Sequence, residues 1–209
     1  MYRCGQLCVC FCGEDSILSN LAPYDLTLFI HGAKHEFNSS EQAYQWSKLH
    51  WLRLHQEAEL LLNHTSPKQV MFAARTALTS ERENLKQNPT QLVAFQDLEA
   101  AWKSHYATQV LQDLAIRKAT AFPTFANELQ INRNKLFIEA TKDSFWGCGY
   151  TAGQIRNMSE AHLVQNIRGS NTMGKILSTV AEQLYLRDVD AVIIAPLQYE
   201  QFREGHKQF

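Results

Sequence analysis

The 209-residue sequence predicts a helix-rich α+β fold in a single domain, with a small β-sheet formed mainly by the N-terminal segment. Short runs rich in β-branched and aromatic residues lie within the first forty positions. Most of the remaining chain repeats its apolar residues at helical spacing. At 45% hydrophobic residues, a chain of this length can bury a substantial core, and no repeat, linker or low-complexity tract divides it.

The N-terminal segment contains most of the predicted strands. Residues 6–12 form the first strand, and residues 26–37 form a hairpin. Side chains two apart on a strand share a face, so Cys8, Cys10 and Cys12 would line one buried side of the first strand. The same cysteines could instead hold zinc or a redox centre. We favour the strand interpretation, because no distant Cys or His pair completes such a site.

Helices dominate the remainder. Ser39 can cap a helix that starts at residue 40, and Gln42 can complete a capping box with it. A second helix is expected to start at Pro67, with Ser66 as its cap. The other expected elements are a hairpin turn near residues 31–32, helical patterning over 55–64, a surface loop over 80–92, a long helix over 94–119, a shorter helix after residue 123, a strand over 135–141, a glycine-punctuated loop over 143–150, a closing helix over 171–188 and a strand or tail element over 190–197.

Charge and hydropathy exclude some classes of function. The net charge is -1 and the pI is about 6.7. The protein therefore has no overall positive charge that would attract it to nucleic acid or to a membrane surface. No run of 18 apolar residues is present, so we expect no membrane span. The N-terminus is a poor signal peptide, and a cytoplasmic location is therefore expected.

The helix that starts at residue 40 has an unusual face. At about 100° per residue, Glu41, Gln45 and Lys48 fall on one stripe, which also carries or adjoins large apolar residues such as Tyr44 and Trp51. Two interpretations remain open. The stripe could form the wall of a ligand cleft, or Glu41 and Lys48 could form a buried ion pair that only specifies packing.

A loop after the strand over 135–141 carries a second group of candidates. Asp143 precedes Trp146, Gly147 and Gly149. Glycines on both sides of a Trp allow the backbone to approach a ligand closely, while the ring can stack on a base or sugar. Turns of this composition also fill cores, so the fragment alone does not establish a site.

Two shorter fragments have equally simple structural explanations. Asn171 could cap the closing helix, and Gly174 in its first turn would let a phosphate approach the helix N-terminus. Ser19 and Asn20 lie in the loop before the hairpin, where such residues usually form turns.

Taken in order, these fragments resemble the NADAR (YbiA-like) family. The matching pieces are Phe-x(6)-Leu-Ser-Asn, Phe-x-x-Ser-Glu-Gln-x-Tyr-Gln-x-x-Lys, a Trp within a long helix, Ile-Glu-Ala-Thr-x-Asp-x-x-Trp-Gly-x-Gly and Asn-x-Met-Gly-x-x-Leu. The resemblance implies a NADAR domain over residues 1–186 and leaves residues 187–209 as a C-terminal extension of unassigned role. It also implies an N-glycosidase that hydrolyses the bond between ribose C1 and a nitrogen.

The resemblance further implies a substrate and a set of site residues. The expected substrate is ADP-ribosylated guanine in nucleic acid or nucleotides. The alternatives are phosphoribosylamino-pyrimidine intermediates of riboflavin synthesis and a binding module that holds ADP-ribose or NAD without turnover. No cofactor, metal or membrane partner is expected, and the oligomeric state stays open. The implied catalytic residues are Glu41, Lys48 and Asp143, and the implied substrate-binding residues are Ser19, Asn20, Gln45, Trp102, Trp146, Gly147, Asn171 and Gly174.

Overall fold

The structure is a computed structural model that describes residues 2–30 and 33–186, and it has the helix-rich α+β architecture that the sequence predicts. The hairpin turn expected near residues 31–32 and the element expected over 190–197 lie outside the described residues. In chain order the elements are β1 (Tyr2–Cys4), β2 (Cys8–Phe11), β3 (Leu26–Ile30), β4 (Ala33–Phe37), α1 (Ser40–Trp51), α2 (His55–Leu61), α3 (Pro67–Leu85), α4 (Pro89–Ala101), a π-helical segment (Trp102–Tyr106), α5 (Ala107–Ala121), α6 (Pro123–Ile131), β5 (Leu136–Glu139), α7 (Ala152–Arg156), α8 (Glu160–Gln165) and α9 (Thr172–Leu186).

Two small sheets replace the one that was expected. In the three-stranded sheet, β2 lies in the centre, antiparallel to β1 and parallel to β5. β3 and β4 form a separate antiparallel hairpin, as predicted. The parallel pairing of β2 with β5 brings the first dozen residues against a segment more than a hundred positions away, which local sequence patterns do not reveal.

Burial on both faces of the three-stranded sheet explains the alternation in β2. Val9 and Phe11 belong to the main core, whereas Cys8 and Cys10 belong to a smaller core on the opposite face. The helices α7 and α8, which the sequence did not predict, contribute Ile155 and Leu163 to that smaller core. The prediction that the cysteines line one buried side of a strand is therefore confirmed for Cys8 and Cys10, and Cys12 lies just beyond the strand.

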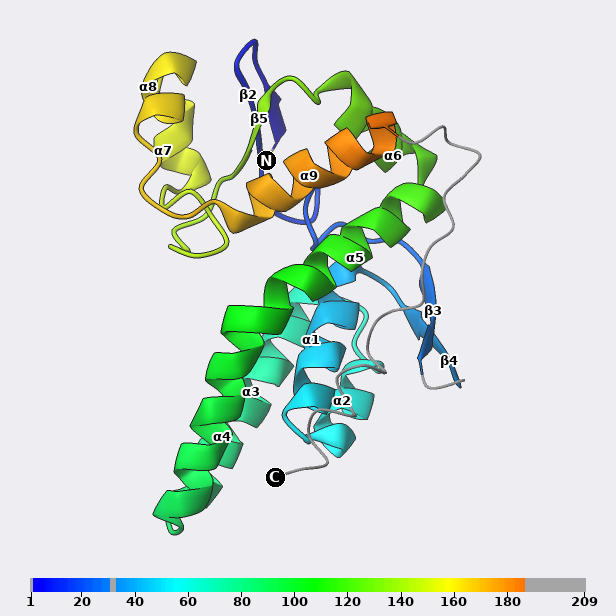
Figure 1. The fold of residues 1–209 in the computed structure, drawn as a ribbon, viewed down its shortest axis with the longest axis vertical. Coiled ribbons are helices and arrows are strands. Elements are labelled where there is room, and N and C mark those ends of the chain that lie inside the picture. Colours follow the sequence, from blue (N-terminus) through cyan, green and yellow to red (C-terminus); the bar gives the residue numbers. More distant parts are fainter. Residues whose placement is uncertain (1, 31–32, 187–209) are drawn as a thin grey trace.

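Figure 1 shows how the helices divide the molecule. α1, α2, α3 and α4 form a helical part, and the three-stranded sheet lies in the other part with α7, α8 and α9. α5 packs against α1 in the first part and against α9 in the second, so it joins the two.

The start of α1 is fixed by the predicted cap. Ser39 Oγ accepts a hydrogen bond from the backbone N–H of Gln42 at 3.2 Å. The side chain of Gln42 bonds the N–H of Asn38 at 2.7 Å, one residue before the position that a capping box would use. Its amide also donates to the carbonyl of Leu61, so Gln42 ties the first turn of α1 to the end of α2.

The prediction of a surface loop over 80–92 was wrong. α3 continues to Leu85 and α4 already begins at Pro89. Asn88 caps α4 through a hydrogen bond from the N–H of Gln91, and Pro89 occupies the first helical position, where its missing N–H costs nothing. The polar composition of this stretch reflects exposed helix surface, because the two helices pack through only a few of its residues.

The predicted long helix is interrupted at Trp102. The π-helical segment separates α4 from α5 without ending the helical path. Such single-turn π segments occur often near functional sites, because they change which residues face a neighbouring element. In this chain the side chain of Trp102 is buried against α1.

None of the helices in the described part of the chain has the length and apolar character needed to cross a bilayer.

Candidate active site

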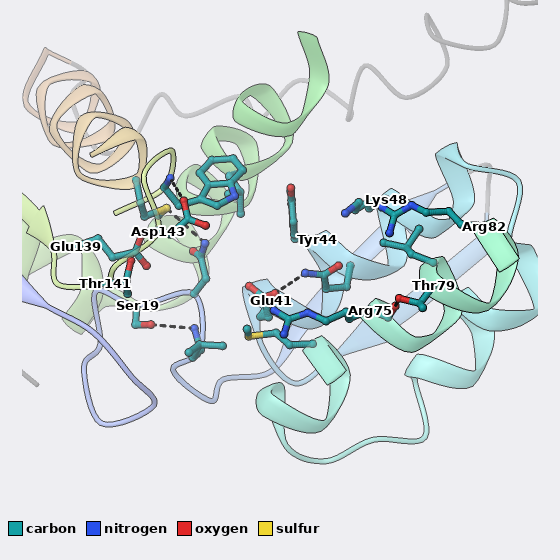
Figure 2. A pocket seen from close by; sticks show the side chains of 18 residues that line it. Ser19, Glu41, Tyr44, Lys48, Arg75, Thr79, Arg82, Glu139, Thr141 and Asp143 are labelled. Atoms are coloured by element: carbon teal, nitrogen blue, oxygen red, sulfur yellow. Dashed lines mark hydrogen bonds between the residues drawn. The ribbon is translucent and has the colours of Figure 1, made fainter. Parts of the chain in front are cut away.

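A pocket with a volume of about 780 Å³ lies where the two parts of the molecule meet. Figure 2 shows side chains from several elements that converge on it. α1 and α3 form one side, and the segment after β5 forms the other, with the loop before the hairpin and the start of α9 between them. The lining residues are Ser19, Asn20, Leu21, Glu41, Tyr44, Gln45, Lys48, Met71, Arg75, Leu78, Thr79, Arg82, Leu111, Glu139, Thr141, Asp143, Trp146 and Met173.

The stripe of α1 faces this pocket. Glu41, Gln45 and Lys48 all line it, and Gln45 Nε2 donates a hydrogen bond to Glu41 Oε1 at 2.7 Å. No ion pair joins Glu41 to Lys48 within residues 2–30 and 33–186, and neither side chain forms another one there. The geometry therefore favours the cleft wall over the packing ion pair.

Burial shifts the pKa values of Glu41 and Lys48 in the directions that favour the neutral form of each side chain. Desolvation raises the pKa of Glu41, and the hydrogen bond from Gln45 and the charge of Lys48 offset this only in part. Desolvation also lowers the pKa of Lys48, although the carboxylates of Glu99 and Glu41 act in the opposite direction. A lysine with a lowered pKa has a larger fraction of the nucleophilic amine at neutral pH.

α3 supplies two cations that the sequence analysis missed. Arg75 and Arg82 lie seven residues apart, and both line the pocket together with Thr79. Arg82 already forms a two-point ion pair with Glu99, at 2.9 and 2.6 Å. Arg75 forms no ion pair in the described part of the chain. On a predominantly polar helix these arginines resemble ordinary surface residues. The only sequence signal for a shared site is their spacing, since Arg75, Thr79 and Arg82 at i, i+4 and i+7 lie on one face of α3.

The opposite end of the pocket is acidic. Figure 2 shows Glu139, Thr141 and Asp143 on one side, with Lys48 and Arg82 on the other. Asp143 is held by its own turn, since Oδ1 accepts hydrogen bonds from the N–H groups of Phe145 and Trp146 at 2.8 and 2.6 Å. The pocket therefore runs from a carboxyl-rich end to a cationic end.

A buried lysine holds the loop that carries Ser19 and Asn20. Lys118 Nζ donates to the carbonyl oxygens of Ile17 at 2.6 Å and Ser19 at 3.0 Å. It also lies 5.0 Å from the ring centroid of Tyr24 and 4.6 Å from that of Phe125. Burial lowers the pKa of Lys118 to about 7. This residue carries no local signal in the sequence, because its acceptors lie about a hundred residues away.

Seven of the eleven predicted site residues line the pocket: Ser19, Asn20, Glu41, Gln45, Lys48, Asp143 and Trp146. The other four do not. Trp102 is buried and donates from Nε1 to the hydroxyl of Tyr44 at 3.2 Å, so it lies behind a residue of the wall. A Cβ at Gly147 would lie 2.0 Å from Thr141 Oγ1, which shows how tightly this turn packs.

Asn171 and Gly174 serve the connection between α9 and β5. Asn171 adopts a positive φ of 49° and does not act as the predicted helix cap; its side chain accepts from the N–H of Glu139 at 3.0 Å and donates to the carbonyl of Phe137 at 2.7 Å. A Cβ at Gly174 would lie 2.1 Å from that same carbonyl oxygen. The N–H groups of Thr172 and Met173 already bond backbone carbonyls of the preceding loop. The first turn of α9 is therefore engaged with protein and is not open to a phosphate as expected.

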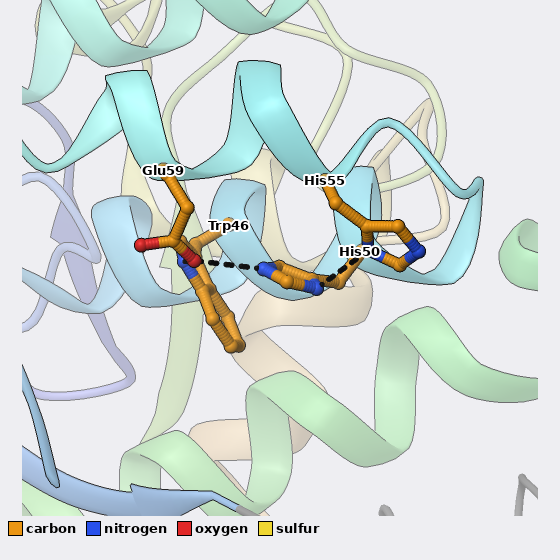
Figure 3. Close-up of polar contacts among 4 residues, drawn as sticks. All are labelled: Trp46, His50, His55 and Glu59. Carbon is orange, nitrogen blue, oxygen red and sulfur yellow. Dashed lines mark hydrogen bonds and ion pairs between the residues drawn. The ribbon is translucent and has the colours of Figure 1, made fainter. Parts of the chain in front are cut away.

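A second polar cluster joins the outer side of α1 to α2 (Figure 3). His50 contacts Glu59 Oε1 through Nε2 at 3.1 Å and His55 Nδ1 through Nδ1 at 2.9 Å, and Trp46 Nε1 also donates to Glu59. Among the residues that the structure describes, no group of three or more His, Cys, Asp or Glu side chains could hold a metal ion. We interpret this cluster as a helix–helix contact.

Comparison with known proteins agrees with the family resemblance and with the fold. A family model of the NADAR domain matches residues 10–185. The chain belongs to the NADAR family. The NMR structure of the E. coli protein YbiA is similar to this NADAR chain with a TM-score of 0.54, at 20% sequence identity and over 86% of each chain, which shows a shared fold. None of the curated proteins matches the chain significantly.

Membership of the NADAR family supports a glycosidase-type role in general terms. It does not select a substrate for this chain.

Proposed function

We propose that this NADAR protein is an N-glycosidase that removes ADP-ribose from guanine bases in nucleic acid or nucleotides. The observation that carries the proposal is the polarity of the pocket, with Glu139 and Asp143 at one end, Lys48 and Arg82 at the other, and Glu41 and Arg75 between them. Cleavage of a C1–N bond develops positive charge on the sugar carbon, which nearby carboxylates stabilise. A diphosphate needs cations a short distance from that carbon.

The size and wall chemistry of the pocket agree with a nucleotide-scale ligand. A volume of about 780 Å³ lies within the range of pockets that enclose cofactor-sized molecules. Trp146 lines the pocket beside Asp143, and its ring contacts Tyr44 edge-on at a centroid distance of 5.9 Å. Trp146 can offer a flat surface to a base or ribose.

We assign a different role in the reaction to each of the charged residues of the pocket. Asp143, exposed at the pocket wall and held by two backbone N–H groups, is placed to face the oxocarbenium-like carbon. Glu41, held by Gln45, lies between the acidic and cationic ends and can orient ribose hydroxyls or the attacking water. Lys48 can contact a phosphate or attack C1 as an amine. Two cations without an ion-pair partner among the described residues, Lys48 and Arg75, favour a diphosphate over the single phosphate of a phosphoribosylamino pyrimidine.

The test is mass spectrometry of reactions with ADP-ribosylated guanine as the free base, the nucleotide and an oligonucleotide. The wild type is compared with Glu41→Gln, and with Glu182→Gln as a matched control, since Glu182 is exposed on α9 and away from the pocket. Release of ADP-ribose by the wild type and the control, and a loss of at least about 100-fold in Glu41→Gln, is the expected result.

Two other outcomes would assign a different substrate or a binding function to the protein. Absence of release from all three substrates, with turnover of phosphoribosylamino pyrimidines, would favour the smaller substrate. Binding of ADP-ribose in calorimetry without turnover of either class would favour a binding module.

A further inference from the structure

The last residue of β5, Glu139, is partly exposed in the pocket, and the described structure provides no hydrogen-bond or ion-pair partner for the buried oxygen of its carboxyl group. Its Oε2 is buried and accepts or donates no hydrogen bond within the described residues, and no ion pair there involves Glu139. The residue lines the pocket. A buried carboxyl oxygen without a partner is costly to folding. A packing role does not explain it, because an apolar side chain would fill the same space at lower cost.

The backbone around this carboxyl group is rigidly held. The N–H of Glu139 donates to Asn171 Oδ1 at 3.0 Å, and its carbonyl accepts from the N–H of Cys148 at 2.9 Å. Asn171 also bonds the carbonyl of Phe137, so the end of β5 is fixed to α9 from two sides. A side chain on a strand held in this way is well suited to precise positioning toward a ligand.

The three carboxyl groups that line the pocket differ in the hydrogen bonds that they accept. Asp143 accepts two backbone N–H bonds, and Glu41 accepts one hydrogen bond from Gln45. Glu139 has no such donor, and the charges of Glu41 and Asp143 both oppose its ionisation. Burial and these two charges raise the pKa of Glu139 to about 7. Burial also raises the pKa of the nearby Cys148 thiol. When like charges share a site, the group without donors is the one that keeps its proton.

We propose that Glu139 is the general acid that protonates the leaving nitrogen of the base, an inference that rests on the N-glycosidase function proposed above. As the C1–N bond breaks, its electron pair passes to the base nitrogen, which takes the proton from the Glu139 carboxyl group. A water molecule then adds to C1 and gives one proton to the Glu139 carboxylate. The products are ADP-ribose and the unmodified guanine, which stays within its nucleotide or nucleic acid, and Glu139 is again protonated.

The experiment compares the pH profiles of kcat/KM for the wild type, Glu139→Gln and Glu139→Asp on ADP-ribosylated guanine. We expect the wild-type rate to fall on the alkaline side of pH 7 as Glu139 loses its proton. Glu139→Gln should be at least about 100-fold slower and should lose this alkaline limb, because an amide cannot donate in the same way. Glu139→Asp should be slower but should keep the limb. Glu182→Gln should match the wild type throughout.

A measurement of stability separates chemistry from misfolding. The raised pKa means that the folded state binds more protons than the unfolded state between pH 4.5 and about 7, so ionised Glu139 destabilises the fold above pH 7. Glu139→Gln should therefore melt at a higher temperature than the wild type at pH 8. An active Glu139→Gln variant, or one that keeps the alkaline limb, would overturn the assignment of Glu139 alone. An inactive wild type would overturn the proposed function together with it.

Discussion

Trp102 Nε1 donates a 3.2 Å hydrogen bond to the hydroxyl group of Tyr44, and the two rings meet at a centroid distance of 5.7 Å. Only Tyr44 of the pair lines the pocket. The Trp that the family resemblance assigns to substrate binding thus acts, in this structure, through a residue of the wall. Burial raises the pKa of the Tyr44 hydroxyl well above its usual range, so this group is a neutral hydrogen-bond donor at the pocket surface.

A double-mutant cycle on this pair tests the indirect role of Trp102. Trp102→Phe should reduce kcat/KM in the wild-type background but have little further effect in Tyr44→Phe, because the missing bond is the same in both. In urea unfolding the coupling energy should be about 1 kcal/mol. Additive losses of kcat/KM would instead indicate that Trp102 contacts the substrate directly.

Lys48→Arg tests whether the amine of Lys48 attacks C1. The variant keeps the positive charge and removes the nucleophile, so a covalent role predicts a loss of at least about 100-fold in kcat. Borohydride reduction during turnover should then attach ADP-ribose to Lys48 in the wild type, as mass spectrometry of peptides would detect. The control is Lys142→Arg, which alters an exposed lysine next to Asp143. Full activity of Lys48→Arg would leave Lys48 with a phosphate contact only.

Arg75→Gln tests the pocket cation that lies beside Glu41. Arg75 has no ion-pair partner among the described residues, so its charge is available to a phosphate, whereas Arg82 is already paired with Glu99. We expect KM for the ADP-ribosylated substrate to rise roughly 10-fold with a small change in kcat, and the salt dependence of KM to weaken. Arg156→Gln, at an exposed position of α7, is the matched control. A fall in kcat at constant KM would place Arg75 near the reacting carbon instead.

Lys118→Met tests how burial of an amine affects stability. Burial lowers the pKa of Lys118 from 10.5 to about 7, so between these pH values the unfolded state binds one more proton than the folded state. The free energy of unfolding should therefore rise with pH across this range because of Lys118. Urea unfolding at pH 6, 7.5 and 9 should show this rise in the wild type and in Lys175→Met, an exposed control, but not in Lys118→Met. Lys118→Met should also raise KM, since the loop of Ser19 loses its anchor.

The sequence predicted those pocket residues whose position follows from local secondary structure. Glu41, Gln45 and Lys48 share a face because the helical period requires it, and the Ser39 cap sets where that helix begins. Sequence patterns did not predict the roles of residues whose contacts lie far away in the chain. Asn171 resembled a helix cap, but its partners are 32 and 34 residues away on β5.

The sequence by itself determined the secondary structure of most segments, the order of the NADAR motifs and the charged stripe of α1, because these follow from interactions within one or two helical turns or from adjacent residues. Only the tertiary structure decided that Arg75 and Lys48 face one pocket and that Glu139 lacks a partner. It alone decided that Trp102 supports Tyr44 from behind. The physical reason is that burial, desolvation and pairing belong to the space between elements, and α1, α3 and β5 enclose that space only after the chain has folded.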